Sequence, residues 1–131
     1  MERIEKLKDN QIFVFGSNEN GHHAGGAARQ ALEQFGACWG QSKGLQGQSY
    51  AIVTLDKEML RVPFWYIEEQ LEELLNFATL HSDKEFLVTA IGCGIAGFKA
   101  TDIATICRDV GKNLGGWPTN VIFPTEFKKY M

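Results

Sequence analysis

The sequence predicts a three-layer α/β/α fold, in which helices cover both faces of a mostly parallel or mixed β-sheet. Short apolar stretches alternate with longer stretches of helical periodicity along the chain. Such an alternation requires crossover connections between parallel strands. In two places an apolar stretch leads directly into a glycine-rich loop and then a helical stretch. The 131 residues are expected to form a single domain, residues 1–131, with 1–10 as one helical turn or a frayed start.

The first strand is predicted at residues 11–15, because four consecutive apolar residues indicate a strand that is buried on both faces. A loop with several glycines follows. The apolar positions after it, at helical spacing, predict a helix over about 25–34, and Gly36 is a plausible C-terminal stop. Backbone N–H groups at such a helix start, beside the carboxyl end of a strand, bind anions such as phosphates.

The middle of the chain predicts a loop, a strand and the longest helix. Residues 40–48 are rich in Gly and Gln, which favours a surface loop without regular structure. Residues 49–54 are expected to form the second strand. The helix is expected over 63–81, because Pro63 suits a first turn and an apolar stripe follows it. Four glutamates on this helix are expected to face water; they are Glu68, Glu69, Glu72 and Glu73.

The last third repeats the arrangement of the first. A third strand is expected at 86–91, a glycine loop at 92–98, a helix at about 101–114 and a last strand at 120–123. Thr101 or Asp102 is the expected N-cap of this helix. Ligands of parallel sheets bind beyond the carboxyl ends of the strands, and both glycine loops fall there.

Composition narrows the function classes. The net charge of -3 and the scattered basic residues exclude a general nucleic-acid-binding surface. No apolar run approaches the roughly 20 residues of a membrane span, so no membrane partner is expected. Three cysteines without a C-x-x-C pair fit a reducing compartment, so we expect a cytoplasmic protein without a disulfide framework or cysteine-based zinc site. No cofactor and no metal are predicted.

The two glycine loops and the strand ends beside them are the predicted binding site. The amide of Asn18 could bind a vicinal diol such as that of ribose, or it could hold the loop as a turn residue. His22 could hydrogen-bond to a ligand, or both loop histidines could simply be exposed. The candidate ligand-binding residues are Gly16, Ser17, Asn18, His22, Gly25, Gly26, Ala27, Thr89, Gly92, Cys93, Gly94, Ile95, Ala96, Gly97 and Phe98.

Other kinds of site fit less well. The loop at 92–98 has no Lys-Ser/Thr pair, so it does not support a triphosphate-hydrolysing P-loop. Its glycines match the G-x-G-x-x-G spacing, but the acidic residue of a Rossmann site is absent. Cys93 could be a nucleophile, although a small side chain filling a tight loop is the favoured interpretation. Asp56 and Lys57, after the second strand, are the ionisable candidates for acid–base chemistry.

The order of these motifs resembles the macro domain, the fold that binds ADP-ribose. Phe15-Gly16-Ser17-Asn18 is similar to the family's first strand end. Gly25-Gly26-Ala27-Ala28 is similar to its first glycine loop, and residues 92–98, Gly-Cys-Gly-Ile-Ala-Gly-Phe, to its second. The resemblance spans about residues 11–124.

The resemblance implies that Asn18 binds the distal ribose, that the glycine loops cradle the diphosphate and that Phe98 packs near the sugar or adenine. The chain departs from the family's hydrolases at Ala27, Ala28 and Ala96, where some of them have acidic residues. It also starts too late for the additional strands with which larger members read adenine.

Three functions remain open at this stage. The leading one is binding of ADP-ribose or a related nucleotide-sugar diphosphate, free or on an ADP-ribosylated target. The second is hydrolysis of an ADP-ribosyl bond, with Asn18, Asp56 and Lys57 as catalytic candidates. The third is a Rossmann-like nucleotide binder outside the macro family.

Overall fold

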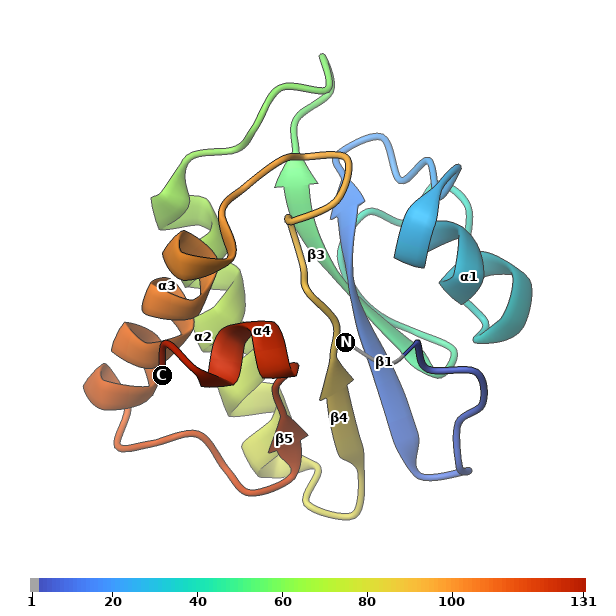
Figure 1. Ribbon diagram of the computed structural model, residues 1–131. Helices are drawn as coiled ribbons and strands as arrows, with labels where there is room; N and C mark the ends of the chain where they lie inside the picture. Colours follow the sequence, from blue (N-terminus) through green and yellow to red (C-terminus); the bar gives the residue numbers. More distant parts are fainter. Residues whose placement is uncertain (1–2) are drawn as a thin grey trace.

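In residues 3–131, which the computed structural model describes, a five-stranded mixed sheet lies between helices on both faces (Figure 1). The strand order is β2-β3-β1-β4-β5, with β2 antiparallel to β3 and the other pairs parallel. The predicted three-layer α/β/α architecture is therefore confirmed. The elements are β1 (Gln11–Asn18), α1 (Gly26–Gln34), β2 (Gly44–Gln46), β3 (Ser49–Leu55), α2 (Phe64–Leu80), β4 (Glu85–Val88), α3 (Ala100–Asn113), β5 (Val121–Ile122) and α4 (Thr125–Lys128).

The central strand, β1, supplies apolar side chains to both faces of the sheet. Phe13 and Phe15 pack with residues of α1, while Ile12 and Val14 join the larger core on the other face. Side chains alternate between the faces of a strand, so an uninterrupted apolar run fits a strand covered on both sides. The prediction of a doubly buried first strand is confirmed.

The two helical layers differ in size. α1 alone covers one face, and α2, α3 and α4 cover the other (Figure 1). Within residues 3–131, no helix is both long enough and apolar enough to cross a membrane. Fully buried aliphatic side chains from α2 and α3 form the centre of the larger core; they are Ile67, Leu71, Leu74 and Ile103.

Several element boundaries differ from the prediction. The segment expected as an irregular loop at 40–48 contains β2, because residues 44–46 pair with β3 around a turn at Gly47, whose φ is +61°. α3 begins at Ala100 with Lys99 as its N-cap, so neither Thr101 nor Asp102 is the cap. β4 ends at Val88, three residues before the predicted end. The short helix α4 was not predicted.

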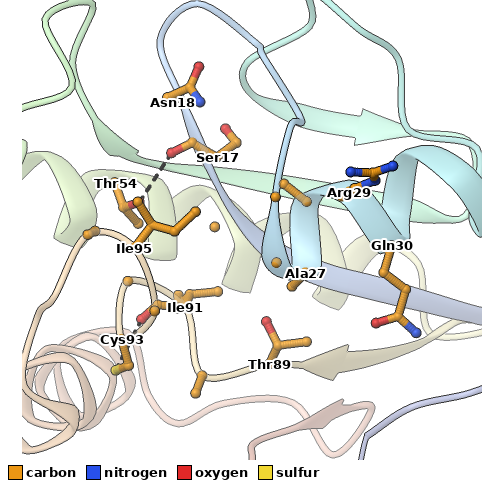
Figure 2. A pocket seen from close by; sticks show the side chains of 18 of the residues that line it. Ser17, Asn18, Ala27, Arg29, Gln30, Thr54, Thr89, Ile91, Cys93 and Ile95 are labelled. Carbon is orange, nitrogen blue, oxygen red and sulfur yellow. Dashed lines mark hydrogen bonds between the residues drawn. The ribbon is translucent and has the colours of Figure 1, made fainter.

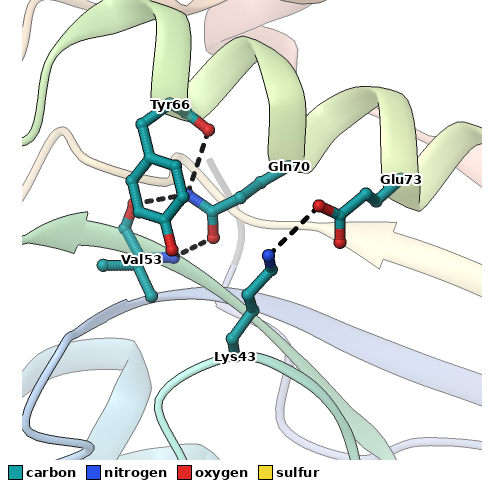
Figure 3. Close-up of polar contacts among 5 residues, drawn as sticks. All are labelled: Lys43, Val53, Tyr66, Gln70 and Glu73. Carbon is teal, nitrogen blue, oxygen red and sulfur yellow. Dashed lines mark hydrogen bonds and ion pairs between the residues drawn. The ribbon is translucent and has the colours of Figure 1, made fainter.

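A glutamine side chain replaces a missing strand at the edge of the sheet. β2 pairs with β3 only as far as Ala51, so the backbone of Val53 has no strand neighbour on that side. Figure 3 shows Gln70 of α2 in its place. The Val53 N–H donates to Gln70 Oε1 at 2.7 Å, and Gln70 Nε2 donates to the Val53 carbonyl at 2.9 Å. Lys43 and Glu73 form an ion pair beside it, at 3.1 Å.

Replacing Gln70 by leucine is expected to lower the free energy of unfolding by about 2 kcal/mol, because two buried backbone groups of Val53 lose their partners. Urea denaturation followed by circular dichroism measures this change. Asn76→Leu, at an exposed position of the same helix, is the matched control. Equal effects of the two substitutions would contradict a structural role for the Gln70 amide.

Candidate ligand-binding site

A cavity of about 810 Å³ opens at the carboxyl edge of the sheet, where β1 and β3 end (Figure 2). This size is ordinary for a small-molecule or cofactor site. Both glycine-rich loops contribute to its walls, as do the strand ends and the first turns of α1. The predicted juxtaposition of the two loops at one sheet edge is present in the structure.

Most of the predicted binding residues line this cavity. Four residues named at the sequence level do not: Gly97, Phe98, Asp56 and Lys57. Phe98 is buried instead, against Phe64 and below the Arg61 guanidinium. The predicted residues that do line the cavity are Gly16, Ser17, Asn18, His22, Gly25, Gly26, Ala27, Thr89, Gly92, Cys93, Gly94, Ile95 and Ala96.

The hydroxyl groups at the strand ends hold the scaffold together. Thr89 Oγ1 donates to the Val14 carbonyl at 2.8 Å, and Thr54 Oγ1 donates to the Ser17 carbonyl at 3.2 Å. The Ser17 hydroxyl donates in turn to the carbonyl of Ser42. These side chains therefore fix the cavity walls, and their hydroxyl hydrogens are already bonded to backbone carbonyls.

The buried amide of Asn18 closes a turn. Its Nδ2 donates to the His22 carbonyl at 2.9 Å, and its Oδ1 accepts from the His22 N–H at 3.0 Å. The interpretation of Asn18 as a loop-holding residue is thus confirmed. Nδ2 keeps a second hydrogen and Oδ1 a second lone pair, so the amide can also bind a ligand in the cavity.

The second glycine loop folds back on itself. The Gly97 N–H donates to the Gly94 carbonyl at 3.0 Å, and the Phe98 N–H donates to the Gly92 carbonyl at 2.8 Å. Gly92 has a φ of +76°, a conformation that favours glycine. The N–H groups of Gly94, Ile95 and Ala96 have no acceptor within the described chain. The loop therefore presents consecutive donors, as an anion-binding nest does.

The first glycine loop faces the second across the cavity. It leads into α1, whose first N–H groups, from Gly26 onward, have no intrahelical partner. A Cβ placed on Gly25 would lie 3.3 Å from Ile95 Cδ1, so the two loops approach each other closely. Gly25 itself has an extended backbone, with a φ of -153°. We call the part of the cavity that both loops line the slot; N–H groups without an acceptor in the described chain belong to its wall residues from both loops.

Arg61, which the sequence analysis did not single out, ties the β3–α2 connection to the second glycine loop. Its Nε donates to the Ala96 carbonyl at 2.9 Å, and its guanidinium lies 5.3 Å from the centroid of the Phe98 ring. A Cβ on Gly97 would approach Arg61 Nη2 to 3.2 Å. Arg61 therefore positions the loop from outside the cavity.

Cys93 lines the cavity but is poorly suited to be a nucleophile. Burial, reinforced by the charge of Glu126, raises the pKa of its thiol. Its thiol donates a hydrogen bond to the Ile91 carbonyl oxygen, with Sγ 3.6 Å from that oxygen. Since the thiolate is the reactive form, a raised pKa disfavours covalent catalysis at neutral pH. The interpretation of Cys93 as a small side chain in a tight loop is favoured.

The two neighbouring histidines have different environments. His22 is exposed and stacks on Trp39, with ring centroids 4.8 Å apart. His23 is fully buried, so the interpretation of both as exposed loop residues is wrong. Its Nε2 lies 3.0 Å from Gln46 Oε1, which also accepts the Cys38 N–H at 2.8 Å. Residues 3–131 contain no group of three or more His, Cys, Asp or Glu side chains that could hold a metal ion.

Asp56 and Lys57 lie in the β3–α2 connection, where their hydrogen bonds hold the local backbone in place. Asp56 Oδ1 accepts the N–H groups of Glu58 and Leu60, at 2.9 and 3.0 Å, and so forms a local turn. Lys57 is exposed, and its carbonyl accepts from Asn20 Nδ2 at 3.1 Å. Neither residue is in the cavity wall, which removes the geometric basis for their predicted catalytic role.

The chain matches no protein-family model and no curated protein. It is similar in structure to a solved protein of unknown function from Bacteroides thetaiotaomicron, with a TM-score of 0.56 and 16% sequence identity. The similarity covers 91% of this chain and 89% of that chain. At this identity the likeness shows the fold alone.

The thiols are expected to react with iodoacetamide in a fixed order. Exposed Cys38 is modified first, and Cys93 reacts slowly at pH 7.5 and faster at pH 9, because its raised pKa leaves little thiolate at neutral pH. Cys107, whose pKa burial raises to about 12, reacts only after unfolding. Peptide mass spectrometry measures these rates. A Cys93 rate at pH 7.5 equal to that of Cys38 would restore the nucleophile hypothesis.

Proposed function

We propose that this chain binds ADP-ribose or a related nucleotide-sugar diphosphate, with the diphosphate held between the two glycine-rich loops. The observation that carries the proposal is that both glycine loops line one cavity and that wall residues of each have N–H groups without an acceptor in the described chain. A diphosphate has acceptor oxygens on opposite sides, which suits donors that face one another. Neither loop alone provides this arrangement.

Local donors must supply the attraction, because the chain as a whole has a net charge of -3. The N-terminal end of α1 carries a partial positive charge, and the first residues of this helix line the cavity. Hydrogen bonds from N–H groups to an ionised phosphate are short and roughly twice as strong as neutral ones. Arg29 of α1 also lines the cavity, but it is paired with Glu33 of the same wall at 3.0 Å, so the main-chain donors carry the attraction.

The resemblance to the macro domain supports the same ligand. The mixed α/β/α sheet agrees with the fold that this resemblance implies, and most of the residues that carry it line one cavity, Gly97 and Phe98 excepted. In this proposal Asn18 binds a ribose with its remaining donor and acceptor while it holds the turn. The ligand is free ADP-ribose or the ADP-ribosyl group of a modified target.

Binding without turnover is favoured over hydrolysis of an ADP-ribosyl bond. Asp56 and Lys57, the proposed acid–base pair for hydrolysis, are outside the cavity wall. Cys93 has a raised pKa and is a poor nucleophile. A Rossmann-like nucleotide binder remains the other alternative, and it would prefer NAD to ADP-ribose in competition.

The Gly25→Val variant tests the proposal. Gly25 has an extended backbone that tolerates any residue, so the substitution narrows the slot without backbone strain. We expect the unsubstituted protein to bind ADP-ribose with a micromolar Kd, about 8 kcal/mol, and the variant to bind at least tenfold more weakly. Isothermal titration calorimetry with ADP-ribose, AMP and NAD measures both.

The double variant Gly25→Val/Ile95→Ala is the matched control, because it removes the side chain that the new valine meets. Partial recovery of ADP-ribose affinity would locate the ligand in the slot. Undiminished affinity in Gly25→Val would contradict the proposed site. Tighter binding of NAD than of ADP-ribose would favour the Rossmann-like alternative.

A further inference from the structure

A second hollow, which we call the rear groove, lies beside the first glycine loop. It has a volume of about 340 Å³. Three of its wall residues, Ala24, Arg29 and Glu33, also line the main cavity, so the two spaces share a boundary along α1. A single extended ligand would occupy both by crossing this boundary, where Arg29 and Glu33 form an ion pair at 3.0 Å. The wall residues of the rear groove are His23, Ala24, Arg29, Leu32, Glu33 and Trp39.

One wall of the rear groove is an aromatic ring that is largely free. The Trp39 side chain is 56% exposed, and its main ring contact is the stacked His22 ring, with an interplanar angle of 13°. An exposed indole held flat by one neighbour is a platform on which a second planar ring can stack.

His23, another wall residue, has a buried ring nitrogen without a partner. Gln46 Oε1 accepts the Cys38 N–H, which fixes the orientation of that amide, so His23 Nε2 must be the donor in its contact with Gln46. In the neutral ring the remaining atom, Nδ1, then carries a lone pair. Nδ1 is buried and has no hydrogen-bond partner within the described chain. Nearly all buried polar atoms in proteins are satisfied, so this exception points to a missing donor.

We infer that the rear groove holds the nucleobase of the bound nucleotide, which stacks on Trp39 and donates an amino hydrogen to His23 Nδ1. This inference rests on the proposed function, since the diphosphate in the slot places the base. Nδ1 is enclosed in the structure, so a side chain of the groove wall must move for the base to reach it. Adenine carries the required amino donor, whereas hypoxanthine carries a carbonyl oxygen at the same position.

Two matched comparisons test the inference. The first compares ADP-ribose with its hypoxanthine analogue, and we expect the analogue to bind about tenfold more weakly. The second compares Trp39→Ala with Trp65→Ala, because Trp65 is also exposed, at 64%, but lines neither hollow. Trp39→Ala is expected to weaken ADP-ribose binding about tenfold and to abolish the preference for adenine. Trp65→Ala is expected to leave both unchanged.

Nitrogen-15 spectra of the histidine rings distinguish base binding from a merely structural role of Trp39, because only a bound base would change the His23 Nδ1 resonance. The His23 Nδ1 resonance is expected to shift when ADP-ribose binds, and to shift less with the hypoxanthine analogue. Equal affinities of Trp39→Ala and the unsubstituted protein, or an unshifted Nδ1 resonance at saturation, would overturn the inference.

The outcomes separate this inference from the proposed function. Loss of binding in Gly25→Val without any effect of Trp39→Ala would retain the diphosphate slot and overturn the base site. If ADP-ribose does not bind, the proposed function fails. Titration with adenosine then tests the rear groove by itself. If adenosine causes no shift of the His23 Nδ1 resonance that depends on Trp39, the base site is overturned.

Discussion

The site depends on the parallel pairing of β1 with both of its neighbours. β1 pairs with β3 from Phe13 to Asn18 and with β4 from Gln11 to Val14. Because all three strands run in the same direction, the loops that follow them meet at one edge. The approach is close at the end of β1, where a Cβ on Gly16 would lie 3.3 Å from the Gly92 nitrogen. Without this pairing, the two glycine loops would not share a cavity.

Around the cavity, polar side chains hold the walls in place, while main-chain groups remain available to bind a ligand. Thr54, Thr89 and Asn18 hydrogen-bond to neighbouring backbone, and Arg61 holds the second glycine loop from outside. The free donors are then mainly main-chain N–H groups. Main-chain donors fixed in this way need little reordering when a ligand arrives, which lowers the entropic cost of binding.

Sequence patterns predicted the features that arise from neighbouring residues. The apolar run of β1, the stripe of α2 and the glycine loops each follow from local periodicity or backbone freedom. Contacts between distant segments could not be predicted in this way. Gln46 meets His23 across 23 positions, and Arg61 meets Ala96 across 35. The burial of His23 depends on how the segment before β2 folds over it, which no local pattern encodes.

The same limit explains the error at Asp56. Its place after a parallel strand predicted a ligand-facing carboxylate, but the residue instead accepts two N–H groups of its own loop. Aspartate commonly forms such local turns. Whether a strand-end carboxylate faces a cavity or its own backbone depends on the path of the next few residues, which spacing alone does not fix.

The central claim is that main-chain N–H groups of both loops bind the diphosphate. Proton–nitrogen correlation spectra of the labelled protein, recorded during titration with ADP-ribose, test it most directly. The account predicts that the amide resonances of Gly26, Gly94, Ile95 and Ala96 shift most, and downfield, as each N–H gains an ionised acceptor. Large shifts elsewhere with these four amides unmoved would contradict it.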